Sequence, residues 1–221
     1  AVLDEVATTA GLNEGLANPD QPFNALSASD SATARIEESS AALDVLGLNY
    51  ADARYALDAR LHPHRVLVGS ETFPAQIGAL WPMVEEHPHV IGDFTWTGWD
   101  YLGEVGIGAV AYAEDSPELK GLEREYPFLT AWCGDIDITG WRRPVSFYRE
   151  IVFGLRSEPY IAVRRPSRAG HTVALATPWA WSDSVSSWTW RGFEGARVHV
   201  EVYADADEVV LELDGAEVAR A

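Results

Sequence analysis

Glu71 stands directly after an apolar run, at a place where a carboxylate can do chemistry. The run RVLVGSE carries apolar residues from Val66 to Gly69 and then ends in Ser70 and Glu71. Near-continuous apolar runs are typical of strands buried on both faces of a parallel sheet, and reacting groups sit at the carboxyl ends of such strands. A glutamate there can act as nucleophile, base or metal ligand. The alternative is structural, with Ser70 capping the next helix and Glu71 stabilising its N-terminus.

A second group of polar and aromatic residues follows the next apolar run, in the segment VIGDFTWTGWDYLGE. Aromatic rings can stack on the C–H faces of sugars, and carboxylates accept hydrogen bonds from hydroxyls. Trp96 and Trp99 should point to opposite faces of a strand, so we expect only one to face a ligand. The alternative is that both are core residues. The candidates for substrate binding here are Trp96, Asp100 and Glu104.

Strand and helix patterns alternate through the first three quarters of the chain. Helical patterns follow or lie between the apolar runs, and Pro74 and Pro144 suit the first turns of two of these helices. Such alternation is typical of βαβ units in an α/β barrel or a doubly wound sheet. The expected strands are Val6–Thr9, Leu46–Asn49, Val66–Gly69 and Val90–Phe94; the expected helices are Ala32–Leu43, Ala51–Arg60, Pro74–Glu86 and Pro144–Leu155.

After about Pro166 the apolar period changes to two. Alternating valines and leucines occur around residues 198–202 and 209–213, and Asp214-Gly215 supplies a two-residue hairpin turn. This pattern predicts antiparallel sheet, joined to the first part by a linker at Arg164–Gly170. A complete sandwich needs roughly 100 residues, so we expect a partial one. The expected domains are residues 1–165 and 166–221.

The composition narrows the class of protein. The chain has 221 residues, a net charge of −18 and one cysteine, Cys133, so no disulfide can form within it. A strongly acidic chain repels phosphates and anionic lipids, so we expect neither nucleic acid nor membrane as a partner. The first residues lack the pattern of a signal peptide, and we expect a cytoplasmic protein. Position 1 is Ala1, which is consistent with an excised piece of a longer protein.

Together these segments resemble a known family. GLNY, RVLVGSETFP, GDFTWTGWDYLGE and CGDIDITGWRRPVSFY are similar to consecutive barrel segments of glycoside hydrolase family 2, above all its β-galactosidase members. PWAW and VEVYADADEVVLELDG resemble the immunoglobulin-like domain that follows the barrel in a bacterial branch of the family. The resemblance implies an α/β fold, the C-terminal half of a TIM (β/α)8 barrel (strands five to eight), followed by a truncated all-β immunoglobulin-like sandwich.

The resemblance also implies roles for single residues. Glu71 matches the catalytic nucleophile of a retaining glycosidase, and Tyr50 matches the tyrosine that hydrogen-bonds it. Trp96 and Asn49 match sugar-binding positions, and Asp100 and Glu104 match polar positions after strand eight. The implied reaction is retaining hydrolysis of terminal β-galactosides, with no cofactor. A β-glucuronidase or β-mannosidase of the same family is the alternative, and a homo-oligomeric state of the full-length enzyme stays open.

The second catalytic carboxyl is not evident. Family members place the acid/base glutamate in a segment like WSxGNE, and Asn13-Glu14 lacks the Trp-Ser-x-Gly lead. We interpret TTAGLN as the end of strand five and Glu14 as a loop residue. The acid/base should then lie upstream of Ala1, and the isolated chain should be inactive.

Two other interpretations concern histidines and tryptophans. His62-Pro63-His64 and His87-Pro88-His89 have the spacing of metal ligands, but both precede their strands, so we expect no metal site. Four tryptophans near the start of the second unit could form a sugar-binding surface, which would make the chain a non-catalytic carbohydrate-binding or spacer module. Packing of the second unit against the barrel is the interpretation we favour. These residues are Trp179, Trp181, Trp188 and Trp190.

Overall fold

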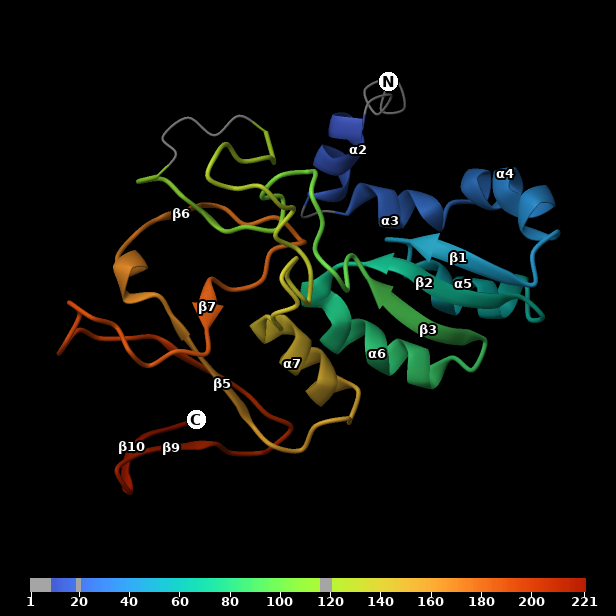
Figure 1. The fold of residues 1–221 in the computed structure, drawn as a ribbon. Helices are drawn as coiled ribbons and strands as arrows, with labels where there is room; N and C mark the ends of the chain where they lie inside the picture. The colour runs from blue at the N-terminus through green and yellow to red at the C-terminus, as the bar shows by residue number, and fades with distance from the viewer. Residues whose placement is uncertain (1–8, 19–20, 116–120) are drawn as a thin grey trace.

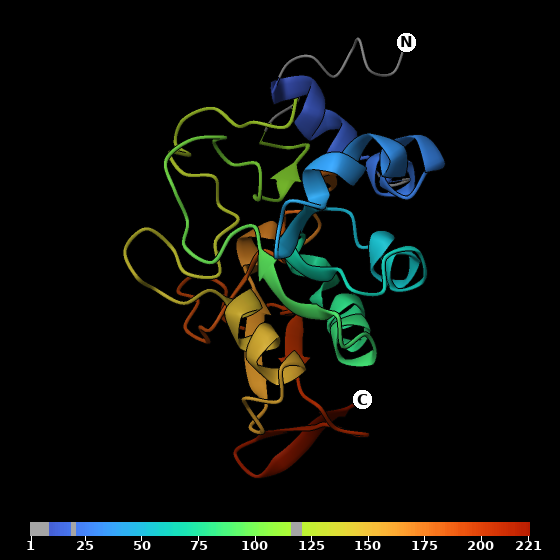
Figure 2. The same ribbon diagram turned by 90° about the vertical axis from the view of Figure 1, so that its right-hand side faces the viewer.

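The computed structural model describes residues 9–18, 21–115 and 121–221. A parallel sheet with its helices forms one part of the fold, and small antiparallel sheets form the other (Figure 1). Helix α2 and the C-terminal hairpin lie at opposite ends of the molecule, as Figure 2 also shows. No helix among the described residues is long and apolar enough to cross a membrane.

The parallel sheet has three strands in the order β1-β2-β3, namely Val45–Asn49, Val66–Thr72 and Val90–Thr95. Three of the four expected strands are therefore confirmed. Their registers pair Asn49 with Glu71 and Thr72 with Thr95, so the three carboxyl ends lie side by side. Leu48, Leu67 and Val90 are buried together with Tyr55 of the first connecting helix, which explains why these runs are apolar.

The four expected helices occur close to their predicted bounds, and two further helices precede them in the described part of the chain. The N-terminal part contains α2 Thr9–Leu16, α3 Pro22–Ser27 and α4 Asp30–Ser40. The sheet connections are α5 Arg54–Leu61, the short 3-10 helix η1 Pro74–Gln76 and α6 Ile77–Glu86, and α7 Pro144–Val152 follows later. Figure 2 shows α5 and α6 on the same side of the sheet. As expected, a proline opens both η1 and α7.

The N-terminal segment differs from the prediction. Thr9–Leu16 is a helix, so the interpretation of TTAGLN as the end of a strand is wrong for Thr9 to Asn13. Glu14 lies on this helix, exposed, and not in a loop. The apolar run here is short and a glycine interrupts it, so it carried no clear period of two. The rest of the expected strand Val6–Thr9 lies outside the described residues.

The antiparallel part contains three small sheets. β5 Tyr160–Arg164 pairs with β7 Ser184–Val185 and β8 Val200–Tyr203, while β4 Ala111–Tyr112 pairs with β6 Val173–Leu175. Hence β5, which precedes the expected boundary after residue 165, pairs with strands that follow it; the 3-10 helix η2 Pro166–Arg168 comes next. β9 Val210–Leu213 and β10 Ala216–Arg220 form the expected hairpin, with positive φ at Asp214 and Gly215.

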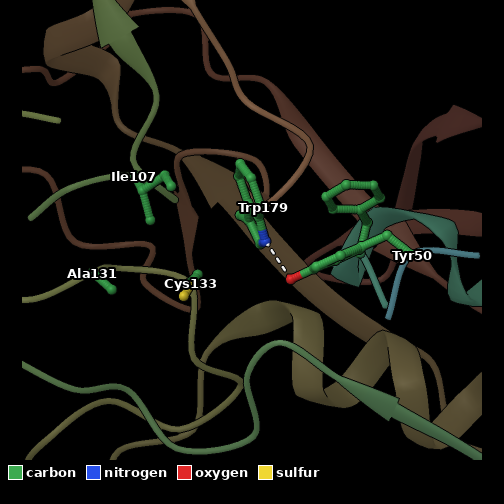
Figure 3. Packing of buried hydrophobic residues seen from close by; sticks show 6 residues of the cluster. Tyr50, Ile107, Ala131, Cys133 and Trp179 are labelled. Atoms are coloured by element: carbon green, nitrogen blue, oxygen red, sulfur yellow. Dashed lines mark hydrogen bonds between the residues drawn. The ribbon is translucent and has the colours of Figure 1, made fainter. Parts of the chain in front are cut away.

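A buried aromatic core joins the two parts. Tyr50 at the end of β1 packs with Phe73 after β2 and with Trp179, which lies between β6 and β7 (Figure 3). Trp181 packs on Tyr148 of α7 at 5.1 Å between ring centroids. Two of the four clustered tryptophans therefore pack the C-terminal segment onto the rest of the chain, whereas Trp188 is exposed.

A buried ion pair ties the N-terminal helices to the sheet. Arg54 and Asp58, one turn apart on α5, form a salt bridge and are 1% and 0% exposed. Arg54 also donates to the Ser27 carbonyl at 2.8 Å and to Thr33 Oγ1 at 2.9 Å, while Asp58 accepts from Arg65 at 3.0 Å. The arginine thus connects α3, α4 and α5.

We predict that Asp58→Asn lowers the free energy of unfolding by about 3–5 kcal/mol, because it leaves the buried charge of Arg54 without its counter-ion. Glu37→Gln is the matched control: Glu37 pairs with Arg65 at 3.2 Å but is half-exposed, and it should cost at most about 1 kcal/mol. Urea unfolding followed by tryptophan fluorescence measures both. Equal losses in the two variants would contradict the importance of the buried pair.

Candidate active site

The three strand ends open into one cavity of about 470 Å³. Tyr50 follows β1, Glu71 lies near the end of β2, and Trp96 follows β3. Backbone hydrogen bonds hold these positions together: Tyr50 N–H donates to the Glu71 carbonyl at 2.8 Å and Trp96 N–H to the Thr72 carbonyl at 2.9 Å. The cavity is lined by Leu12, Asn13, Leu16, Phe23, Ser27, Asn49, Tyr50, Ala51, Glu71, Trp96, Glu104, Ile107 and Trp179.

Glu71 is partly buried, and its surroundings act on its carboxyl in opposite directions. Burial is the main cause that raises its pKa above the ordinary carboxyl value, and the charge of Glu104 raises it further. Hydrogen bonds from Tyr50 and Asn49 favour the carboxylate and lower the pKa. The net direction is upward. Two donors therefore aim at a carboxylate that burial destabilises.

Tyr50 has a strained backbone and a fixed hydroxyl. Its φ is 51°, in the left-handed region that non-glycine residues seldom adopt, and its side chain is buried. The Trp179 indole N–H donates to its hydroxyl at 2.9 Å, shown as the dashed line in Figure 3. Burial is the main cause that raises the pKa of Tyr50 above its ordinary value. The hydroxyl therefore keeps its proton and can donate it in a hydrogen bond to Glu71.

Asn49 is oriented by the neighbouring strand. Ser70 Oγ, next to Glu71, donates to the Asn49 side-chain oxygen at 2.7 Å. With the amide oxygen occupied, the amide N–H₂ of Asn49 is directed to its other side, where Glu71 is its hydrogen-bond partner. Ser70 thus takes part in the site and does not cap the following helix.

Glu104 forms a second polar chain across the same cavity. The Trp96 indole N–H donates to the Tyr101 hydroxyl at 3.0 Å, and Tyr101 in turn donates to Glu104. Asn13 of α2 donates to the other carboxylate oxygen of Glu104 at 2.6 Å. The structure therefore brings together five of the six predicted site residues, namely Asn49, Tyr50, Glu71, Trp96 and Glu104.

The sixth predicted residue, Asp100, does not reach this cavity. It is 5% exposed, and its carboxylate accepts hydrogen bonds from Thr130 Oγ1 at 2.7 Å and from the backbone N–H groups of Trp132 at 3.2 Å and Cys133 at 3.3 Å. Asp100 therefore holds together the two ends of the long loop that follows β3. The predicted substrate-binding role of Asp100 has no support from this position.

The sequence does not point to two residues that line the cavity, Trp179 and Asn13, or to Tyr101, which hydrogen-bonds Glu104 beside it. The sequence favours packing for Trp179, offers Asn13 only as the neighbour of Glu14, and indicates no role for Tyr101. No local spacing reveals Trp179 or Asn13, because Trp179 and Tyr50 lie 129 positions apart and Asn13 and Glu104 lie 91 apart, whereas Tyr101 stands only three positions before Glu104. Glu14 itself does not line the cavity.

The other reactive side chains point elsewhere. His62 Nε2 lies 3.3 Å from Glu37, and His89 Nε2 lies 2.9 Å from the Tyr55 carbonyl. Among the described residues, no three His, Cys, Asp or Glu side chains gather as a metal site would require. Cys133 is buried, and this burial is the main cause that raises its thiol pKa to about 12. It therefore remains a protonated core residue.

The raised pKa of Glu71 predicts that this residue affects the stability of the fold in a pH-dependent way. The folded protein holds this proton more tightly than the unfolded chain does. Ionisation of Glu71 therefore lowers the free energy of unfolding as the pH rises from the unfolded pKa through the folded pKa, and it has no effect at pH values below the unfolded pKa. We expect Glu71→Gln to raise the thermal midpoint at pH 7, and this gain to shrink towards pH 4. Glu85→Gln, on an exposed part of α6, is the control. A gain that is absent, or equal at both pH values, would refute the argument.

Solved structures of related sequence include two from one bacterial species. One is a glycosyl hydrolase family 2 member from Bacteroides cellulosilyticus, 33% identical, with a TM-score of 0.71 over 87% of this chain and 24% of that chain. Another family 2 member from the same species is 32% identical, with a TM-score of 0.62 over 87% of this chain and 21% of that one. No family model matches, and no curated protein matches. The chain spans less than a quarter of the length of either structure, and at this identity over most of its own length it belongs to glycoside hydrolase family 2.

Proposed function

We propose that this chain is part of the catalytic domain of a retaining β-glycosidase, with Glu71 as the nucleophile. β1, β2 and β3 then correspond to strands six, seven and eight of a (β/α)8 barrel, and the C-terminal strands begin an immunoglobulin-like sandwich, with residues 1–165 and 166–221 as the approximate division. The exposed side chains of Ile91 and Phe94 on β3 fit a sheet that continues in the full-length protein. The observation that carries the proposal is that Tyr50 and Asn49 hydrogen-bond Glu71 in a cavity that Trp96 also lines.

The chemistry of a double displacement suits this geometry. The Glu71 carboxylate would attack the anomeric carbon, forming a glycosyl ester while the bond to the leaving oxygen breaks. A second carboxyl about 5–5.5 Å away would protonate that oxygen and later deprotonate the incoming water. Both Glu104 oxygens already accept hydrogen bonds, which suits Glu104 to holding sugar hydroxyls and not to giving a proton. We therefore propose that the acid/base lies in another part of the full-length enzyme.

For the substrate we propose a terminal β-galactoside, with a β-glucuronide or β-mannoside as the alternatives. The choice rests on the resemblance of the barrel segments to β-galactosidases. Trp96 supports a sugar in general: its ring lines the cavity, and its indole N–H is held by Tyr101. A non-catalytic sugar-binding module is less well supported, because Trp179 and Trp181 are engaged in packing and hydrogen bonds.

Covalent trapping tests the nucleophile. A 2,4-dinitrophenyl 2-deoxy-2-fluoro-β-galactoside needs no acid catalyst: the Glu71 carboxylate bonds to the anomeric carbon, and dinitrophenolate leaves with the electron pair of the broken C–O bond. We expect the full-length enzyme to gain the mass of one fluorosugar, on the peptide that contains Glu71. Glu71→Gln should abolish labelling, and the glucosiduronic and mannosyl reagents should label more slowly. Labelling of a different residue, or unchanged labelling in Glu71→Gln, would refute the assignment.

Chemical rescue gives an independent check in the full-length enzyme. Glu71→Gly should reduce turnover of an aryl β-galactoside by several orders of magnitude, since the covalent step is lost. Azide, which fits the vacated space, should restore part of the activity and yield a glycosyl azide of inverted configuration. Asp100→Asn is the matched control, because its carboxylate lies outside the cavity; it should be unaffected by azide. Full activity of Glu71→Gly without azide would remove Glu71 from the mechanism.

The isolated 221-residue chain should show no turnover of the same aryl β-galactoside, since we place its acid/base outside it. Turnover that disappeared in Glu71→Gln would show instead that a second carboxyl within the chain completes the site.

A further inference from the structure

Trp179 comes from the segment between β6 and β7, yet its side chain reaches the wall of the Glu71 cavity. It is 3% exposed, and it contacts Tyr50 and Phe73 edge to face, with ring centroids 5.9 Å and 5.2 Å away. Its only polar atom, the indole nitrogen, donates to the Tyr50 hydroxyl at 2.9 Å (Figure 3). The two neighbouring rings thus fix the direction of this donor.

A donor on the Tyr50 oxygen restricts where the hydroxyl proton can point. A phenol has one proton and can accept through its oxygen, whereas an indole can only donate. With Trp179 donating to the oxygen, the Tyr50 proton must be directed to another acceptor, and its hydrogen-bond partner is the Glu71 carboxyl. Donation by the indole also polarises the O–H bond and strengthens the bond that Tyr50 donates.

We propose that Trp179 is a positioning residue for the Glu71 site: its indole N–H fixes the Tyr50 hydroxyl so that the tyrosine donates to Glu71. This inference rests on the proposed function of Glu71 and deepens it. In addition to its packing, the segment after β6 thus contributes to the chemistry through one hydrogen bond. The titratable groups that surround the pair are Glu104, Tyr101 and Cys133.

Trp181 provides a matched control two positions along the chain. Its indole N–H also donates to a tyrosine hydroxyl, that of Tyr203, at 2.8 Å. It packs against Tyr148 and does not line the Glu71 cavity. Trp179→Phe and Trp181→Phe therefore remove the same kind of bond from the same segment, one at the site and one away from it.

The test measures the rate of fluorosugar trapping in the full-length enzyme as a function of pH. We expect Trp179→Phe to move the acid limb to higher pH, because a weaker Tyr50 bond leaves the Glu71 carboxylate less stabilised. At pH values below the limb, the trapping rate of Trp179→Phe should be about three- to ten-fold lower than that of the wild type, which is the size expected for one hydrogen bond. Trp181→Phe should keep the wild-type limb. A limb that stays in place in Trp179→Phe, with or without a lower plateau, would overturn the proposal.

A double-mutant cycle tests whether Trp179 acts through Tyr50. In a Tyr50→Phe background, Trp179→Phe should cause no further shift of the limb, since the hydroxyl it acts on is gone. An additional shift of equal size would refute the route through Tyr50. If Trp179→Phe does not fold, a 3-benzothienylalanine at position 179, in which sulfur replaces the N–H, removes only the donor and should give the same shift. Absence of trapping in the wild type would instead refute the role of Glu71 itself.

Discussion

The hydrogen bond between Trp179 and Tyr50 is the contact on which the arrangement of this molecule depends. It joins the end of the first parallel strand to a segment 129 residues later, inside a core in which both side chains are buried. The bond serves packing and polarity together, because a buried phenol needs a partner for its oxygen and the indole supplies one. The same contact that docks the C-terminal segment also sets the environment of Glu71. A change at this contact therefore affects both the packing of the C-terminal segment and the surroundings of Glu71.

The parallel register does the rest of the positioning. Because β1, β2 and β3 run in one direction, their last residues form a single rim, and Asn49, Glu71 and Trp96 meet there. The loop after β3 then folds back over the rim, held by the buried carboxylate of Asp100, and delivers Glu104. Two acidic side chains thus share one cavity, each served by an indole–phenol pair: Trp179 and Tyr50 for one, Trp96 and Tyr101 for the other.

The sequence allowed much of the rim to be predicted, and for identifiable reasons. Buried strands leave short apolar runs, so three strands and the place of Glu71 at the end of one could be inferred from residues 46–49, 66–69 and 90–94 alone. The Asp214-Gly215 hairpin was equally clear, since few residue pairs tolerate two positive φ angles. The helix at Thr9–Leu16 was missed because its weak apolar pattern fits either structure. Asp100 and Glu104 look alike in sequence, and only the folded loop distinguishes Asp100, which holds the loop together, from Glu104, which lines the cavity. Trp179 depends on a contact across most of the chain, which no local pattern encodes.

Cys133 gives this aromatic core a built-in reporter. It is the chain's single cysteine, and it is buried in the cluster that contains Tyr50 and Trp179. Since a thiol reacts as its thiolate and needs access to solvent, alkylation at this position has to wait until the cluster separates. The modification rate therefore follows the opening of this cluster, without any introduced probe. Opening of the core where the two parts of the molecule meet can thus be measured by the reaction of a single thiol.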